Sequence, residues 1–281
     1  DSFNRTTMES LLTGIEESTL LGDIKNDLLL DTAKKITIEG ITIPSTLTSD
    51  ELVYADEKNA ILVASDNLTL LEDISGSEFS LSSVDSDKIS ELLAATLKSK
   101  MFSTSVVDNL VSVFNNNDIR HDLDTTNNDS LVATIKSIDT KVKWKTEIDL
   151  IKSLLEIDTK EEVSEALFTS IESSTLLGGC KANLLLRMIN EIDKNQPDLD
   201  LDTTITVTDL TANDYAEYKL EKQVLINLVS IEDIDMDTID TSTKGTVATL
   251  LNNLKESKVF KNVYGDVVSD ITTSMSDNED L

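Results

Sequence analysis

Four aspartates in the second half of the chain have the residue type and the spacing of a metal site. Asp198, Asp200 and Asp202 alternate along the sequence, and Asp209 occupies the twelfth position counted from Asp198. An EF-hand loop spaces its oxygen ligands in this way, so that alternate carboxylates converge on Ca²⁺. These four residues are the candidate metal ligands of the chain, and Ca²⁺ is the ion that they would bind.

A solvated strand explains the same stretch without a metal. The sixth position, which is glycine in an EF-hand loop, is Thr203 in this chain. Leu199 and Leu201 alternate with the aspartates, as the buried residues of a strand with one solvated face do. The sequence favours this strand over a calcium site, so we expect no cofactor.

Other residues with reactive side chains are few. The single cysteine, Cys180, excludes an internal disulfide, and the single histidine, His121, excludes a His-rich zinc site. We expect Cys180 in the core, His121 exposed in an acidic loop, and Trp144 as an anchor of the core or between modules. A second acidic run, residues 233–240, has no acidic residue at the twelfth position. No catalytic residue and no enzyme activity are predicted.

The charge of the chain limits its partners. It has 24 Lys and Arg against 53 Asp and Glu, which gives a formal net charge of −29. A nucleic-acid binder needs a basic surface that neutralises phosphates, so nucleic acid is excluded as a partner. The sequence contains no run of 18 apolar residues, so we expect no direct membrane insertion. Hydrophobic residues make up 39% of the chain, which is enough for one large core or two ordinary ones.

The chain repeats itself. Residues 15–30 align with residues 171–186 at a constant offset of 156, and eleven of the sixteen positions are identical. Glu57 and Lys58 match Glu221 and Lys222 at an offset of 164, and residues 99–102 match residues 257–260 at an offset of 158. Because these segments keep the same order in both halves, we interpret the chain as a tandem duplication.

Each copy is expected to be incomplete. We place the first repeat module at residues 1–143, truncated at its N-terminal side, and the second at residues 144–281, truncated at its C-terminal side. The helix that starts at Trp144 has its counterpart ahead of residue 1 at the offset of 156. Leu281 falls on Leu123 at the offset of 158, so the second copy lacks the equivalent of residues 124–143.

The predicted fold class is mainly α with minor β, as two tandem copies of an α-helical module that carries short strands. Trp144, Ile148, Ile151 and Leu155 fall on one face of a helix, and similar apolar stripes recur along the chain. Period-two stretches at residues 36–43 and 201–207 predict the strands.

Duplication also predicts that the two copies share one core, so that residues 8–117 and 164–273 superpose. Matched leucines and phenylalanines should then be buried in both copies. The residues expected in the core are Leu20, Leu21, Leu28, Leu29, Leu93 and Phe102, with their partners Leu176, Leu177, Leu184, Leu185, Leu251 and Phe260.

Three short patterns add a resemblance to a known group of proteins. They are Ser-Thr-Leu-Leu-Gly at 18–22 and 174–178, Ile-Thr-Ile or Ile-Thr-Val at 41–43 and 205–207, and Trp-x-x-Glu-Ile at 144–148. With the near absence of cysteine, they resemble the tandem helical repeat modules of very large bacterial cell-surface and adhesion-type proteins. The resemblance implies a non-enzymatic structural or adhesive segment that forms a stalk, filament or array, at the cell surface or outside the cell.

Partners follow from the same interpretation. A module in an array contacts adjacent copies of itself or neighbouring repeat modules, because stacked repeats bury their faces against one another. The alternative function is an intracellular helical scaffold that binds partner proteins in a groove between helices.

Overall fold

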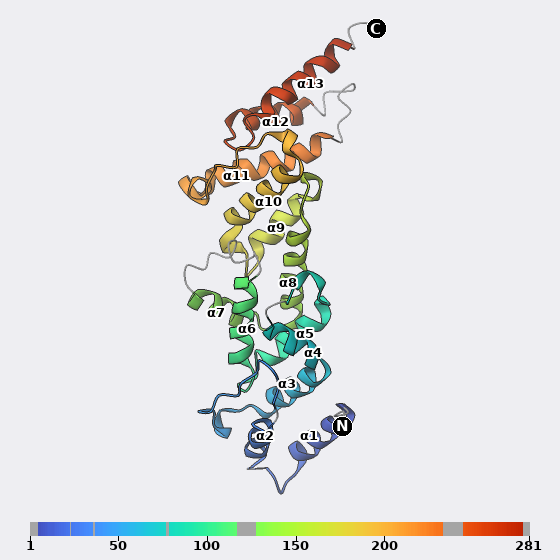
Figure 1. The fold of residues 1–281 in the computed structure, drawn as a ribbon, viewed down its shortest axis with the longest axis vertical. Helices are drawn as coiled ribbons and strands as arrows, with labels where there is room; N and C mark the ends of the chain where they lie inside the picture. The colour runs from blue at the N-terminus through green and yellow to red at the C-terminus, as the bar shows by residue number, and fades with distance from the viewer. Residues whose placement is uncertain are drawn as a thin grey trace. The chain divides into compact units, whose positions relative to one another are not determined.

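The computed structural model describes residues 5–22, 24–35, 37–76, 79–116, 128–232 and 244–277 (Figure 1). These residues are mostly α-helical, so the mainly α part of the expected fold class is confirmed. The chain divides into two compact units, residues 1–152 and residues 153–281. The division falls inside helix α8 (Lys141–Glu156), whereas the sequence places the module boundary between residues 143 and 144.

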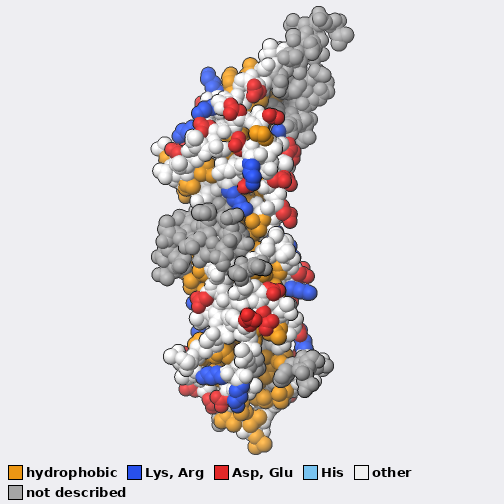
Figure 2. Space-filling model, in the orientation of Figure 1, with side chains coloured by type: hydrophobic (Ala, Val, Ile, Leu, Met, Phe, Trp, Pro, Cys, Tyr) orange, Lys and Arg blue, Asp and Glu red, His pale blue; other side chains and the backbone are white. Residues whose placement is uncertain are grey.

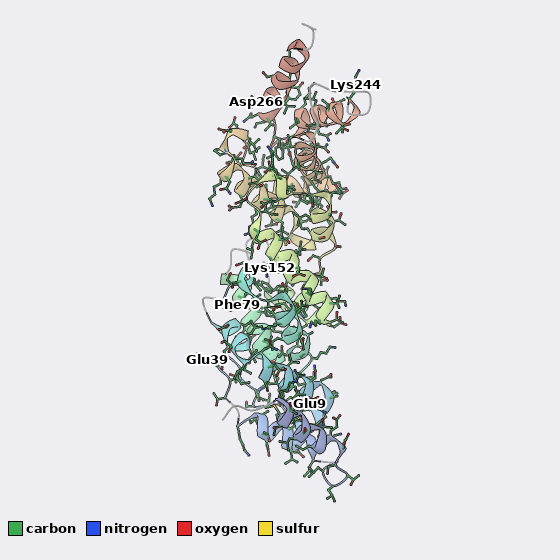
Figure 3. All side chains as sticks on the ribbon, turned by 90° about the vertical axis from the view of Figure 1, so that its right-hand side faces the viewer. Glu9, Glu39, Phe79, Lys152, Lys244 and Asp266 are labelled. Carbon is green, nitrogen blue, oxygen red and sulfur yellow. The ribbon has the colours of Figure 1, made fainter. Side chains whose placement is uncertain are left out.

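Helix α3 is central to the first unit. It packs against both α1 and α5, while α6 packs against α4, α5 and α7. The unit ends with the first part of α8, where the ammonium group of Lys152, labelled in Figure 3, donates a hydrogen bond to the carbonyl oxygen of Val84 (2.9 Å). The elements before α8 are α1 (Arg5–Glu17), α2 (Lys25–Ala33), η1 (Ser49–Glu51), α3 (Tyr54–Asp66), α4 (Leu68–Ser75), η2 (Leu81–Ser83), α5 (Ser86–Thr96), α6 (Ser103–Asn116) and α7 (Asn128–Ser137).

The start of α5 shows how local sequence positions these helices. A carboxylate oxygen of Asp85 accepts hydrogen bonds from the backbone N–H groups of Asp87 (2.9 Å) and Lys88 (3.2 Å). These are two of the donors that a helix start leaves without a partner in the helix. Downstream, Ile89, Leu92 and Leu93 are fully buried, so the cap places an apolar face toward the core.

Helix α11 is central to the second unit. It packs against α10, α12 and η4, and α13 packs against α12. Its backbone is interrupted at residues 212–215, where Asn213, Asp214 and Tyr215 have positive φ angles of 50°, 54° and 63°. The elements of this unit after α8 are η4 (Lys160–Glu162), α9 (Glu165–Ser173), η5 (Gly178–Cys180), α10 (Lys181–Asn195), η6 (Pro197–Leu199), α11 (Val207–Glu232), α12 (Lys244–Glu256) and α13 (Val263–Asp277).

The short strands expected from the sequence are not formed in the part of the chain that the structure describes. In the first copy, Ile38 and Ile41 make only an isolated antiparallel bridge, and Ile36 lies outside the described residues. In the second copy, residues 201–206 are irregular and α11 starts at Val207. Residues 198–205 form a 3-10 turn and a loop, whose polar groups pair within the loop and with residues 259–262 instead of with a neighbouring strand.

Most residues predicted to be core are buried. Eight of them expose no more than 7% of their surface, and Leu21 and Leu251 are half-buried. The prediction is wrong for Leu20, which is 93% exposed, and for Leu28, which is 37% exposed. The eight buried residues are Leu29, Leu93, Phe102, Leu176, Leu177, Leu184, Leu185 and Phe260.

A difference in helix packing explains the exposure of Leu28. The first two helices are α1 and α2 in the first unit and α9 and α10 in the second, and we call each set the first helix pair of its unit. In the first unit α1 packs against the central helix α3, whereas in the second unit α10 packs against the central helix α11. Leu28 on α2 thus keeps an exposed side chain, while its counterpart Leu184 on α10 is buried. The expectation that both copies share one core fails at this helix pair.

Candidate functional site

Asp202, one of the four candidate calcium ligands, already has a cationic partner. One carboxylate oxygen accepts a hydrogen bond from the hydroxyl of Thr204 (2.5 Å), and the other accepts one from the ammonium group of Lys261 (2.6 Å). The hydrogen bonds from Lys261 and Thr204 lower the pKa of Asp202 to about 2. Asp202 is therefore ionised at neutral pH, with its charge directed at a lysine.

Two of the other candidate ligands, Asp209 and Asp200, also accept hydrogen bonds from protein groups. Asp209 accepts hydrogen bonds from the backbone N–H (2.9 Å) and the hydroxyl (2.6 Å) of Thr206, at the start of α11. Asp200 has a left-handed backbone and accepts a hydrogen bond from the side-chain amide of Asn262 (2.9 Å), and Asp198 lies exposed in η6. Within the described residues, no group of three or more His, Cys, Asp or Glu side chains could hold a metal ion.

The remaining residues singled out from the sequence lie in the core or outside the described residues. Cys180 is 2% exposed, and its thiol contacts the carbonyl oxygen of Leu177 (3.1 Å), so the prediction of a buried thiol is confirmed. Trp144 is fully buried in α8. His121 and the acidic run at 233–240 are outside the described residues.

A buried carboxylate in each unit accepts several hydrogen bonds. In the first unit, Glu57 of α3 is fully buried. Its carboxylate accepts hydrogen bonds from the hydroxyl of Ser99 and from the backbone N–H of Lys100 (2.7 Å). The hydroxyl of Ser99 in turn accepts a hydrogen bond from the backbone N–H of Phe102 (3.1 Å). Glu57 thereby fastens α3 to the turn between α5 and α6.

The second unit contains the same arrangement around Glu221 of α11. Its carboxylate accepts hydrogen bonds from the hydroxyl of Ser257 (2.6 Å) and from the backbone N–H of Lys258 (2.8 Å). The hydroxyl of Ser257 accepts one from the backbone N–H of Phe260 (2.8 Å). We call each set of glutamate, serine and backbone groups a carboxylate clamp: Glu57 with residues 99–102, and Glu221 with residues 257–260.

Burial and hydrogen bonding act in opposite directions on the Glu221 carboxyl group. Removal from water raises its pKa, and the hydrogen bonds from Ser257, Lys258 and Val259 act to lower it. Burial is the larger effect, so the pKa of Glu221 lies above its ordinary value. The clamp of the second unit therefore carries a titratable group.

A second polar contact joins the first helix pair to α3 in the first unit. The ammonium group of Lys58 lies 2.8 Å from a carboxylate oxygen of Glu16 on α1. The hydroxyl of Tyr54 donates a hydrogen bond to the carbonyl oxygen of Leu12 (2.8 Å), and the ammonium group of Lys25 lies 5.3 Å from the Tyr54 ring centroid. A cation at this distance from an aromatic face is attracted to it.

Corresponding residues make a similar contact in the second unit. The ammonium group of Lys222 lies 2.8 Å from a carboxylate oxygen of Glu172 on α9, and the hydroxyl of Tyr218 donates a hydrogen bond to the same oxygen (3.0 Å). The ammonium group of Lys181 lies 5.4 Å from the ring centroid of Tyr218 and 4.6 Å from that of Tyr215.

The environment of these groups shifts their titration. Burial raises the pKa of Tyr218, and the neighbouring Glu172 adds to this shift. For Glu172, burial acts to raise the pKa, but the hydrogen bonds from Lys222 and Tyr218 together hold it below its ordinary value. Both groups therefore keep the protonation states that favour their hydrogen bond at neutral pH.

The hydrogen bonds of the clamps hold helices in position. General acid–base catalysis needs a carboxyl group within hydrogen-bond reach of a substrate proton. Glu57 and Glu221 are fully buried, and their oxygens accept hydrogen bonds from a serine hydroxyl and backbone N–H groups. These contacts hold one helix against the start of another.

The sequence repeat aligns the residues of both clamps, but it does not show that they contact one another. The pattern that could have revealed them is an acidic residue at matched positions, Glu57 and Glu221, together with a serine three residues before a phenylalanine in both halves of the sequence. A charged residue repeated among apolar positions indicates a buried contact, because a buried charge needs hydrogen-bond partners.

Comparison of the chain with models of protein families, with curated proteins and with solved structures gives no match. Among the described residues, no helix has the length and apolar character needed to cross a membrane.

Proposed function

We propose that this chain consists of two tandem copies of one α-helical module and is a structural or adhesive repeat segment of a larger bacterial surface protein. In this proposal the segment belongs to a stalk, filament or array, and it has no enzymatic activity. Neighbouring modules of the same kind are its partners.

The carboxylate clamps are the observation that carries this proposal. The repeat aligns Glu57 with Glu221 and Ser99 with Ser257. In each unit the glutamate carboxylate accepts hydrogen bonds from the serine hydroxyl and from the backbone N–H of the next residue. A buried carboxylate that holds the same turn in both halves is a costly feature to acquire twice, since each buried charge needs several partners. Duplication of one module accounts for it.

The junction between the first two helices of each unit repeats as well. The hydroxyl of Ser18 accepts a hydrogen bond from the backbone N–H of Leu21 (3.3 Å), and the hydroxyl of Ser174 accepts one from that of Leu177 (2.9 Å). The polar contacts of this junction recur even though the burial of its leucines differs.

The acidic surface supports an array. A net charge of −29 makes copies of the chain repel one another, which keeps long exposed assemblies soluble. Specific contacts between modules must then come from apolar faces, as in other repeat proteins.

Limited proteolysis of intact source cells tests the proposed location and class. Peptides of residues 1–281 should appear in the medium before lysis, as identified by mass spectrometry. Peptides of an abundant ribosomal protein serve as the control and should stay absent. If peptides of this chain appear only after lysis, the surface segment is excluded and the intracellular scaffold takes its place.

A further inference from the structure

The start of α11 contains a backbone conformation that residues other than glycine rarely adopt. Asn213, Asp214 and Tyr215 have φ angles of 50°, 54° and 63°, whereas residues of a right-handed helix have negative φ angles. Asn and Asp tolerate a positive φ angle, but a bulky residue such as Tyr215 is strained by it. A left-handed turn of this kind persists only where surrounding contacts hold it.

A hydrogen-bonded box of a threonine and an acidic residue stands just before this turn, and the first copy has one as well. In the first copy, a carboxylate oxygen of Glu51 accepts hydrogen bonds from the backbone N–H (2.9 Å) and the hydroxyl (3.0 Å) of Thr48. In the second copy, Asp209 accepts the same two hydrogen bonds from Thr206. The two boxes are related by an offset of 158.

A buried leucine follows each box. Leu52 is 6% exposed and Leu210 is 1% exposed. The clamp glutamates, Glu57 and Glu221, are also buried, but they match at an offset of 164 instead of 158. The second copy therefore has six more residues between the leucine and the glutamate, and the left-handed turn lies in this stretch. Among the described residues of the first unit, none other than glycine has a positive φ angle.

A second contact reaches the turn itself. The ammonium group of Lys181 lies 4.6 Å from the ring centroid of Tyr215 and 5.4 Å from that of Tyr218. The two rings meet edge to face, with centroids 6.1 Å apart and an interplanar angle of 88°, a favoured arrangement of aromatic pairs. Figure 2 shows Lys and Arg side chains beside hydrophobic ones at the level of α11 in Figure 1. Both rings attract the charge of Lys181, which helps to keep Tyr215 in place.

A continuous helix is the other conformation open to this segment. Residues 207–232 contain neither proline nor glycine, and helix lies on both sides of the turn. Ala212, which has an extended backbone in the turn, is a strong helix former. A continuous helix has no backbone strain, but it carries Leu210 out of its buried position, because the residues before the turn change direction. Burial of Leu210 therefore favours the turn, and the strain favours the helix.

We propose that residues 212–215 are a hinge, and that α11 becomes one continuous helix when Leu210 leaves the core. A hinge of this type is a few residues that absorb a large change of φ and ψ. Conversion exposes Leu210 and redirects the first turn of α11, so it changes the surface that the second unit presents. The first copy lacks the six added residues, so only the second unit has this hinge. The proposal does not depend on the proposed function.

Nuclear magnetic resonance of the full chain, labelled with ¹⁵N at its four tyrosines, tests the hinge. A residue with positive φ holds its amide hydrogen close to its own α hydrogen, so the nuclear Overhauser effect between them is strong. In the wild type we expect this effect to be stronger at Tyr215 than at the helical Tyr218. In Leu210→Ser it should fall to the level of Tyr218, and a new effect should join the α hydrogen of Ala212 to the amide of Tyr215, as in a helix. Tyr215→Phe identifies the signal.

A second variant reaches the same state without loss of the leucine. Asn213→Ala combined with Asp214→Ala disfavours positive φ and favours helix, so it should produce the same two changes. If Leu210→Ser unfolds the second unit, as circular dichroism would show, this alanine pair alone decides. Leu52→Ser, at the buried leucine after the first box, is the matched control and should leave the signals of Tyr215 unchanged.

Three results overturn the proposal. The first is a Tyr215 that is already helical in the wild type, and the second is one that keeps its positive φ in the alanine pair. The third is loss of the positive φ without the effect between Ala212 and Tyr215, because the segment has then unfolded instead of becoming helix. An equal change in Leu52→Ser also overturns it, since the turn is then not held by Leu210.

Discussion

Glu221 illustrates how much one buried side chain contributes to this fold. Its carboxylate is the hydrogen-bond acceptor for the hydroxyl of Ser257 and the backbone N–H of Lys258. A buried donor left without a partner costs about 1–3 kcal/mol. The same residue carries an unfavourable contribution, because its charge is removed from water and its pKa is raised.

The raised pKa of Glu221 predicts a pH dependence of stability. Between the ordinary pKa and the raised one, the folded state retains a proton that the unfolded state has lost, so the free energy of unfolding falls as pH rises through this window. Glu221→Gln keeps a hydrogen-bonding side chain of the same size but does not titrate. The difference in unfolding free energy, wild type minus Glu221→Gln, should therefore decrease from pH 4 to pH 7.

Urea denaturation followed by circular dichroism at each pH measures this difference. The difference removes the contribution to the pH dependence of groups with lowered pKa values, such as Glu172 and Asp202, because these groups titrate in both proteins. A difference that stays constant or increases with pH would show that Glu221 is not destabilised by burial.

At the scale of the elements, the first two helices of the first unit, α1 and α2, differ from their counterparts in the second, α9 and α10. Helix α2 has 9 residues and α10 has 15, although both begin at positions related by the offset of 156. The longer helix packs along α11, whereas in the first unit α1 is the main partner of α3 from its helix pair. Similar sequences at the junction thus end in different packing, because the length of the second helix sets how much surface it covers.

A matched pair of substitutions measures this difference. Leu177, at the α9–α10 junction, is fully buried, and Leu20, at the α1–α2 junction, is 93% exposed. Leu177→Ala should lower the free energy of unfolding by about 2–5 kcal/mol, since it removes buried surface and leaves a cavity. Leu20→Ala should change it by less than about 0.5 kcal/mol. Urea denaturation measures both, and equal losses would contradict the difference in burial.

For the whole molecule, the two clamps predict that each unit can be destabilised separately. Glu57→Ala should speed amide hydrogen exchange in α3, α5 and α6 and leave α11, α12 and α13 unchanged. Glu221→Ala should do the reverse, because each clamp lies within one compact unit. Hydrogen exchange read by mass spectrometry resolves these segments, with Glu9→Ala at an exposed position as the control. Faster exchange throughout the chain in either variant would show that the two units unfold as one.

The helical character of the chain and most of its core can be predicted from the sequence. An apolar stripe at helical spacing predicts that Leu93 is buried, because the 3.6-residue period brings such residues to one face. The match between the two halves of the sequence predicts the burial of Leu177 and Phe260, and both are buried. Cys180 is expected in the core because it aligns with the apolar Ile24 and a buried thiol behaves as a small apolar side chain, and it is buried. Alignment of the two halves also brought the clamp residues Glu57 and Glu221 into correspondence, without showing what they bind.

The contacts of those polar residues, and the exposure of some apolar ones, depend on how the helices pack. Alternation at 198–205 predicts a strand, but a strand needs a partner strand, and this backbone instead pairs with a distant turn, where Asn262 donates a hydrogen bond to the carbonyl oxygen of Asp200 (3.2 Å) and Val259 accepts one from the N–H of Asp202 (2.9 Å). Burial of Leu20 and Leu28 depends on which helix packs beside them, a long-range property that local periodicity does not encode. The partners of Glu57 lie more than 40 residues away along the chain, so folding had to bring them together.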